Sequence, residues 1–405
     1  MEQDPTSPVP DDDVPPGSLG RMIERLRSAQ IGALYLEASD GRRYQVIGAE
    51  PGPTAHVVLR QRRALRRFLL GGAVGAAEAY IDGDWDTPDL SATLEFFAAN
   101  ETALQAGFGG NAAGRAVRRL YHMLRVNTRR GSRRNIAAHY DLGNAFYESW
   151  LDQSMTYSCA IFDKSDEELE QAQAEKYNRL CERLAVGADH HVLEIGCGWG
   201  GFAEHAAKTT GCKVTGITIS REQYDHACRR IHEAGLAERV AIRFQDYRDV
   251  DGHYDRVASI EMFEAVGERY WPVFFGKVRD NLASGGRAAL QIITIDDLIF
   301  ERYRKSADFI QRYIFPGGVL PSRTALVREA TEAGLAWIGD QDFGRHYADT
   351  LAQWRDRFAA ARSRIESLGY PDRFRRLWDF YLAYCEAGFR TGRIDLLQIS
   401  LARRA

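Results

Sequence analysis

Apolar and polar positions follow two different periods along the second half of the chain. From about residue 137, short apolar runs typical of buried strands are separated by stretches with the spacing of helices. Repeated strand–helix units favour a parallel sheet with helices on both faces. We therefore predict a doubly wound α/β domain over residues 137–405. Its expected strands are 191–195, 213–219, 240–244, 256–260 and 287–293.

The first part of the chain has another pattern. Short β-rich runs are followed by Arg-rich and Ala-rich stretches of helical composition, which predicts a small α+β domain over residues 18–125. Residues 1–17 are rich in Pro and Asp, and we expect them to be disordered. A basic linker, 126–136, is expected to join the two domains. The runs predicted as strands are 31–36, 44–47 and 56–59, and those predicted as helices are 62–68 and 72–80.

Charge is balanced over the whole chain but not locally. The 405 residues carry 53 basic and 56 acidic side chains, a formal net charge of −3, so the overall charge favours neither a nucleic-acid partner nor a membrane. Residues 101–135, however, hold eight Arg and one acidic residue, and a second Arg cluster covers 60–67. Such clusters are typical of solvated helix faces and linkers, and equally of a contact with anionic phospholipid.

Several features favour a cytosolic protein without metal. The six Cys form no C-x-x-C pair, which fits free thiols in a reducing compartment. The N-terminus has no apolar segment resembling a signal peptide, and no apolar run reaches the ~18 residues of a membrane span. No set of His, Cys, Asp and Glu has zinc-like spacing. We therefore expect a cytoplasmic protein that would reach a lipid substrate from the membrane surface.

A glycine-rich loop is the strongest short motif. Glu194-Ile-Gly-Cys-Gly-Trp-Gly-Gly follows an expected strand and opens an expected helix, where Gly196 and Gly198 allow a tight turn and close approach of a ligand. A dinucleotide site would need an acidic residue at the end of the next strand, where this chain has Thr218 and Ile219. The loop therefore favours S-adenosylmethionine over NAD, and Glu194 suits that ligand.

Longer segments resemble the cyclopropane fatty acid synthase family over residues 20–400. The match includes the IDGDW segment of the family's small N-terminal domain, and its blocks occur in the family's order. Those blocks include HYDLGNAFYESWLDQSMTYSCAIF (139–162), VLEIGCGWGGFAEHAA (192–207), EMFEAVGERYWPVFF (261–275), FIQRYIFPGGVLPS (309–322) and YLAYCEAGFRTGRIDLLQ (381–398).

The resemblance implies a class I methyltransferase fold and a defined reaction. In this family, a cis-unsaturated acyl chain, usually on a phospholipid, takes the methyl group of S-adenosylmethionine. The resulting carbocation loses a proton to a bound bicarbonate, and a cyclopropane ring closes. Because water would trap the cation, the site has to be apolar, and segments 300–320 and 374–389 are rich in apolar and aromatic residues.

The resemblance also assigns residues one by one. Cofactor-contacting positions of the family match Tyr157, Ser158, Gly196, Gly198, Thr218, Ile219 and Gln223, with Asp246 and Tyr247 on the adenine side. Bicarbonate-binding positions match Cys159, Glu264, Ile293 and Tyr347, and a further Cys near the active site matches Cys385. Gln291 stands where the family has His, and it can donate a hydrogen bond but cannot titrate near neutral pH.

This departure leaves the product open. Loss of a different proton from the same cation would give a methyl- or methylene-branched fatty acid, and relatives with that product resemble this chain at Gln291 and at Glu264-Ala-Val-Gly. A small-molecule N- or C-methyltransferase and a lipid-binding protein with a decayed site are further alternatives. The expected partners are an unsaturated phospholipid and an anionic membrane surface, without nucleic acid. A homodimer is compatible with the sequence.

Overall fold

The structure is a computed structural model that describes residues 17–108, 142–164, 167–305 and 308–403. The predicted tail 1–17, apart from its last residue, lies outside the described residues. So do the predicted linker 126–136 and the eight Arg of residues 101–135. No helix among the described residues is long and apolar enough to cross a membrane.

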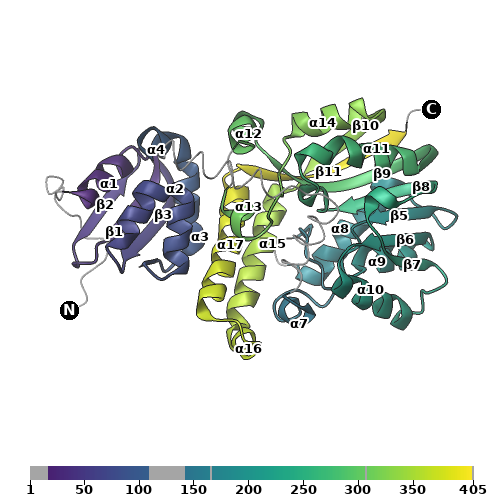
Figure 1. Cartoon of the computed structure of the whole chain (residues 1–405), viewed down its shortest axis with the longest axis horizontal. Helices are drawn as coiled ribbons and strands as arrows, with labels where there is room; N and C mark the ends of the chain where they lie inside the picture. Colours follow the sequence, from purple (N-terminus) through teal and green to yellow (C-terminus); the bar gives the residue numbers. More distant parts are fainter. Residues whose placement is uncertain (1–16, 109–141, 165–166, 306–307, 404–405) are drawn as a thin grey trace. The chain divides into compact units, whose positions relative to one another are not determined.

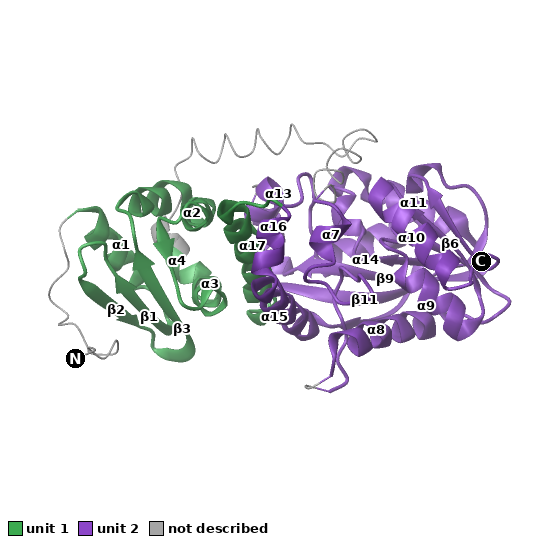
Figure 2. Cartoon of the chain, turned by 90° about the horizontal axis from the view of Figure 1, so that it is seen from below, with its two compact units in different colours: residues 1–120, 369–393 green, residues 121–368, 394–405 purple. Residues whose placement is uncertain are grey.

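The chain forms two compact units that are not continuous in sequence. Unit 1 contains residues 1–120 and 369–393, and unit 2 contains residues 121–368 and 394–405 (Figure 2). This division differs from the predicted domain 137–405, because helix α17 (Asp372–Arg390) belongs to unit 1. There Tyr80 donates a hydrogen bond to Asp379 at 2.9 Å, and the Arg376 guanidinium lies 4.0 Å from the Tyr80 ring centroid.

Unit 1 is the predicted α+β fold around a four-stranded sheet. Its strand order is β2-β1-β3-β4, in which β1 and β3 are parallel and the other pairs are antiparallel. Helix α2 bends at Gly72, whose φ of 57° lies outside the helical range, so the two predicted helices form one kinked element. The strands are β1 (Ile31–Glu37), β2 (Arg43–Ile47), β3 (Glu50–Leu59) and β4 (Trp85–Asp86). The remaining helices are α1 (Ser18–Leu26), α2 (Arg63–Ile81), α3 (Leu90–Ala99) and α4 (Glu101–Phe108).

Unit 2 is built on a seven-stranded sheet with the order β10-β11-β9-β8-β5-β6-β7. Strands β5 to β9 pair in parallel, and β11 is antiparallel to both β9 and β10. All five predicted runs are strands here, while β10 and β11 were not predicted. The strands are β5 (His191–Ile195), β6 (Lys213–Thr218), β7 (Val240–Phe244), β8 (Tyr254–Ile260), β9 (Leu282–Ile295), β10 (Leu335–Asp342) and β11 (Ile394–Arg403).

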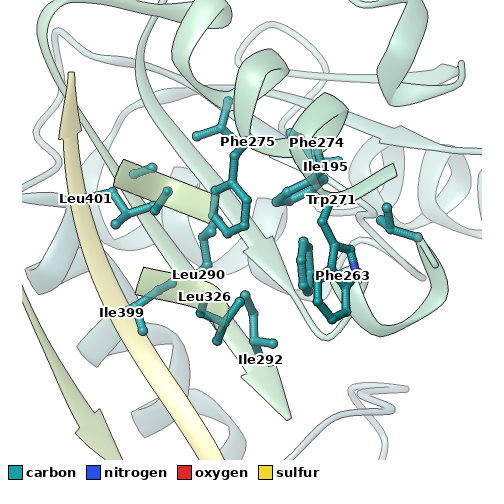
Figure 3. Packing of buried hydrophobic residues seen from close by; sticks show 14 of the residues in the cluster. Ile195, Phe263, Trp271, Phe274, Phe275, Leu290, Ile292, Leu326, Ile399 and Leu401 are labelled. Carbon is teal, nitrogen blue, oxygen red and sulfur yellow. The ribbon is translucent and has the colours of Figure 1, made fainter. Parts of the chain in front are cut away.

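Helices cover both faces of this sheet, which confirms the doubly wound class (Figure 1). Alternate strand residues point to opposite faces, so Val192 packs with α8 and α9, whereas Leu193 packs with α11 and α14. The cluster around Leu193 combines aliphatic side chains with aromatic ones such as Phe263 and Trp271 (Figure 3). The helices named are α8 (Leu169–Leu184), α9 (Gly201–Thr210), α11 (Trp271–Asn281) and α14 (Arg323–Glu332).

Further helices and three 3-10 turns complete unit 2. The helices are α7 (Asn144–Tyr147), α10 (Arg221–Glu233), α12 (Asp297–Tyr303), α13 (Phe309–Tyr313), α15 (Gly344–Ala360) and α16 (Arg362–Ser367). Three 3-10 turns follow strands β7 and β8: η1 (Tyr247–Asp249), η2 (Phe263–Ala265) and η3 (Glu268–Tyr270).

Candidate active site

The predicted site residues of unit 2 gather at one edge of its sheet. The glycine loop follows β5, Thr218 ends β6, Asp246 follows β7 and Glu264 follows β8. Strands β6 and β7 lie on one side of β5, and β8 and β9 lie on its other side. The order in which the strands are added to the sheet therefore changes direction at β5. Parallel sheets bind ligands at such a point, outside the carboxyl ends of the strands.

The glycine loop is held against β6 and has no room for a side chain at its first glycine. The Gly196 and Cys197 amides both donate to the carbonyl of Ile217, at 3.0 and 2.9 Å. Gly196 has a φ of 84°, and a Cβ atom there would lie 2.7 Å from Cγ of Met262. Gly198, with a φ of 52°, has no atom within 4 Å of such a position, so the loop is open on that side. The positive φ favours glycine at both positions, and at Gly196 a side chain would also collide with Met262.

The buried carboxyl group of Glu194 lies directly before this loop. Burial raises its pKa to about 8, an effect that Lys176 and Arg230 oppose. Its Oε2 is buried and has no hydrogen-bond partner among the described residues. An unpartnered carboxyl oxygen next to an open glycine loop is suited to a ligand that donates hydrogen bonds, as S-adenosylmethionine does. The residues present thus fit that cofactor.

The other predicted cofactor residues lie at or after the ends of strands β6 and β7, and two of them contact each other. The Thr218 hydroxyl donates to Gln223 Oε1 at 2.9 Å. Asp246 is buried and paired with Arg248 at 2.6 Å, so its carboxylate already has a strong partner. Tyr247 follows it on η1, and burial raises its pKa to about 12. Ile219, between β6 and α10, keeps part of its surface accessible.

Helix α8 fixes the segment that carries Tyr157, Ser158 and Cys159. Lys176 is fully buried, and its ammonium group donates to the Ser158 hydroxyl and to Gln173 Oε1, both at 2.7 Å. Gln173 in turn donates to the Ser158 carbonyl at 2.9 Å. Burial lowers the pKa of Lys176 to about 8, with Glu261 the strongest opposing influence. Sequence reasoning did not identify Lys176 as a site residue.

A carboxylate that was not predicted stands at the centre of the site. Oε1 of Glu261 accepts the Cys159 amide at 2.9 Å and the Gln291 side-chain amide at 2.8 Å, and Oε2 accepts the Tyr347 hydroxyl at 2.5 Å. Three of the predicted bicarbonate ligands therefore meet at Glu261 rather than at Glu264. The available signal was an acidic residue directly after the apolar strand 256–260, three positions before Glu264.

A buried relay sets the orientation of the Gln291 amide. Arg183 donates to Gln398 Oε1 at 3.1 Å, Gln398 donates to Gln291 Oε1 at 2.9 Å, and Gln291 then donates to Glu261. Because a guanidinium group only donates, the relay has one consistent direction. Gln291 and Gln398 also face each other in the register of β9 and β11. The amide that replaces the family's His is thus a fixed donor.

Glu264 has a poorer set of partners than Glu261. Its Oε1 accepts the Ile293 amide at 2.5 Å, whereas its Oε2 is buried without a hydrogen-bond partner among the described residues. Burial and then the charge of Glu261 raise the pKa of Glu264 to about 8. Burial also raises the pKa of Glu261, but its three donors and Lys176 oppose this. Three donors face the Glu261 carboxyl and one faces that of Glu264, so a negative charge is better stabilised on Glu261, and Glu264 keeps its proton at neutral pH.

These contacts do not fit a bicarbonate ion held as the resemblance implies. The donors of Cys159, Gln291 and Tyr347 already bind a carboxylate of the chain itself. Cys385 lies on α17 in unit 1, so its predicted role near the active site stays a prediction. Among the described residues, no group of three or more His, Cys, Asp and Glu side chains is placed to hold a metal ion.

Comparison with known proteins identifies the family to which this site belongs. The family described as mycolic acid cyclopropane synthetase matches residues 127–399. Tuberculostearic acid methyltransferase UfaA1 of Mycobacterium tuberculosis is 38% identical over 93% of this chain and 89% of its own length. Cyclopropane-fatty-acyl-phospholipid synthase of Escherichia coli K12 is 35% identical over 84% of this chain and 85% of its own.

Solved structures agree with this family. The cyclopropane synthase MmaA2 from Mycobacterium tuberculosis has a TM-score of 0.63 and 29% identity, covering 67% of this chain and 98% of its own. Mycolic acid cyclopropane synthase CmaA1, solved with SAH and CTAB, has the same TM-score, identity and coverage.

Proposed function

Because the chain belongs to the mycolic acid cyclopropane synthetase family, it is an S-adenosylmethionine-dependent methyltransferase acting on lipid acyl chains, and we propose its substrate and product. The substrate is the cis double bond of an unsaturated fatty acyl chain of a membrane phospholipid, and the product is a cyclopropane fatty acid. The observation that supports this proposal is the buried carboxyl group of Glu261, which three donors hold beside the glycine loop.

The side chains of the site have distinct tasks in this reaction. S-adenosylmethionine, when bound, supplies an electrophilic methyl group. Gly196, Gly198 and Glu194 would hold it, and the segment at Tyr157 would close over it. An alkene is a weak nucleophile, so holding it in line with the methyl group supplies much of the rate. The carbocation that results on the acyl chain must lose a proton to a base of the site and must be kept from water.

Aromatic rings provide surroundings that suit a cation. The Trp354 ring lies 5.3 Å from that of Tyr157 and 6.2 Å from that of Tyr347, measured between centroids. Trp150 packs edge-on against Tyr157 at 5.6 Å. The faces of aromatic rings attract positive charge, exclude water and carry no lone pair that would trap a cation. The cluster therefore favours a positively charged intermediate close to the base.

A methyl-branched or methylene-branched product is a second candidate. Ring closure and a methylene branch both end with loss of one proton, so both need only the base, whereas a saturated methyl branch also needs a hydride donor. Two observations favour branching: Gln291 replaces the family's His, and the relative UfaA1 is named a methyltransferase. Which product forms depends on which C–H bond lies nearest the base.

Mass spectrometry of fatty acids tests both candidates. A host that makes cis-unsaturated phospholipid would express the full chain or its Tyr347→Phe variant, which lacks the hydroxyl bound to Glu261. We expect acyl chains heavier by one CH2 with the wild type and far fewer with the variant. Proton NMR of the product then separates a ring from a branch. Unmodified acyl chains in a host rich in such lipid would refute the proposed substrate.

We also propose that the enzyme works at an anionic membrane surface. In unit 1, Arg62, the residue directly before α2, and Arg66 on α2 are exposed four positions apart, and Leu70 follows one turn later, 62% exposed. In unit 2, Leu298 is 91% exposed on α12, five residues after Ile293 of the site. The basic residues next to the exposed Leu70 suit phospholipid head groups over acyl chains.

Vesicle binding tests the membrane proposal. Substituting both Arg62→Gln and Arg66→Gln should weaken binding to phosphatidylglycerol vesicles several-fold, and added salt should weaken binding of the wild type. Arg21→Gln, at an exposed position on α1 of the same unit, is the matched control. Binding that neither salt nor the two substitutions change would contradict an electrostatic contact.

A further inference from the structure

Glu261 combines three features that cost free energy in a folded protein. Burial of its carboxyl group raises the pKa of that group, and a second carboxyl group, that of Glu264, lies close enough for the two to repel each other when both are charged. Its backbone also has a φ of 49°, in the left-handed region that glycine adopts freely and other residues rarely. Strain of this kind persists where surrounding contacts hold a functional residue in place.

Three hydrogen-bond donors contact the carboxyl group of Glu261. They are the Cys159 amide, the Gln291 amide and the Tyr347 hydroxyl, which come from three segments far apart in the sequence. These are three of the positions that the family resemblance assigns to bicarbonate. A glutamate carboxylate and a bicarbonate ion share a planar, negatively charged O–C–O group, so one set of donors can bind either but not both at once.

We propose that Glu261 replaces bicarbonate in this chain, so that the proton acceptor is a side chain of the enzyme. This inference rests on the proposed function. The π electrons of the alkene form a bond to the methyl carbon as its bond to sulfur breaks, and the adjacent carbon becomes positive. A C–H bond of the acyl product then breaks. Its proton goes to a Glu261 oxygen, and its electron pair forms the new ring bond or double bond.

The surroundings of Glu261 suit a base that works near neutral pH. Three donors and the buried ammonium group of Lys176 favour its ionised form, while burial keeps it a stronger base than a solvated carboxylate. Glu264 keeps its proton and adds no second charge. The Gln291 amide cannot compete for the proton, as a His would, because it does not titrate. The replacement of His by Gln and the presence of Glu261 therefore belong to one arrangement.

The first test measures bicarbonate binding directly. Equilibrium dialysis of the full wild-type chain against radiolabelled bicarbonate, with S-adenosylhomocysteine present, should show no saturable binding. Glu261→Gly should bind about one ion per chain, because glycine tolerates the backbone conformation and opens the space of the carboxylate. Glu261→Gln should bind none, since its amide still fills that space. Saturable binding to the wild type would overturn the proposal without any variant.

The second test measures turnover on vesicles of cis-unsaturated phospholipid in carbonate-free buffer. Wild-type turnover should be the same with and without added bicarbonate. Glu261→Gly should lose about a hundredfold in kcat, and bicarbonate should restore about tenfold, while Glu261→Gln should stay inactive under both conditions. Glu268→Gln, at a partly exposed site paired with Arg304, is the control for a lost glutamate. Wild-type turnover that depends on bicarbonate would contradict the inference.

The two tests separate this inference from the proposed function. If the wild type modified no phospholipid acyl chain, the proposed substrate would fail, yet the dialysis would still decide whether Glu261 excludes bicarbonate. Cofactor binding measured by calorimetry checks that each variant is folded. If Glu261→Gly did not fold, the wild-type dialysis and the Glu261→Gln turnover would remain decisive.

Discussion

Replacing Glu264 with glutamine should stabilise the protein by an amount that grows with pH. Burial and the charge of Glu261 raise the pKa of Glu264 from its ordinary 4.5 to about 8. The folded protein therefore keeps a proton that the unfolded chain releases above pH 4.5. That release favours unfolding, so stability falls as pH rises from about 4.5 to about 8 and is level above that range. Glutamine still accepts from Ile293 but does not titrate.

The structure sets the size of this effect. Each pH unit within the window changes the free energy of unfolding of the wild type, relative to the variant, by about 1.4 kcal/mol. The whole interval between 4.5 and about 8 corresponds to about 5 kcal/mol, which is the upper limit because structural relaxation lowers the cost of ionising the group. The two stability curves should therefore converge at low pH and run parallel above about pH 8.

Urea unfolding followed by tryptophan fluorescence, at intervals between about pH 5 and about pH 9, measures the difference. Glu332→Gln, at an exposed position on α14, is the matched control and should give a curve parallel to that of the wild type. A difference between Glu264→Gln and wild type that stays constant with pH would show that native Glu264 is already ionised. The assignment of the charge to Glu261 would then be wrong.

Two further predictions concern groups around the cofactor loop. Lys176→Met should shift the acidic limb of the pH profile of kcat to higher pH, because the Lys176 ammonium group lowers the pKa of Glu261. An unchanged limb would mean that Lys176 acts only on packing. Gly196→Ala should weaken S-adenosylmethionine binding in calorimetry far more than Gly198→Ala, since only at the first position does a Cβ atom collide with Met262. Equal losses would show that backbone strain alone decides.

Much of the fold could be predicted from local patterns. The five strand runs of the catalytic unit, the glycine loop at the end of the first and the small α+β unit all rest on periods and motifs within short windows. Strand β11 was not predicted, because its pattern does not distinguish it from neighbouring helical sequence. Helix α17 was placed in the wrong unit for a related reason. An apolar stripe shows that a helix is buried, but not which core buries it.

The active site, too, could be predicted only in part from the sequence. Residue types and the order of motifs determine by themselves that a glycine loop, an acidic residue before it and the residues Cys159, Glu264 and Tyr347 occur in one chain. Only the tertiary structure decides that Cys159, Gln291 and Tyr347 meet at Glu261, whose partners lie 102, 30 and 86 positions away in sequence. Hydrogen bonds and pKa shifts depend on distance in space and on burial, and neither can be calculated from sequence spacing.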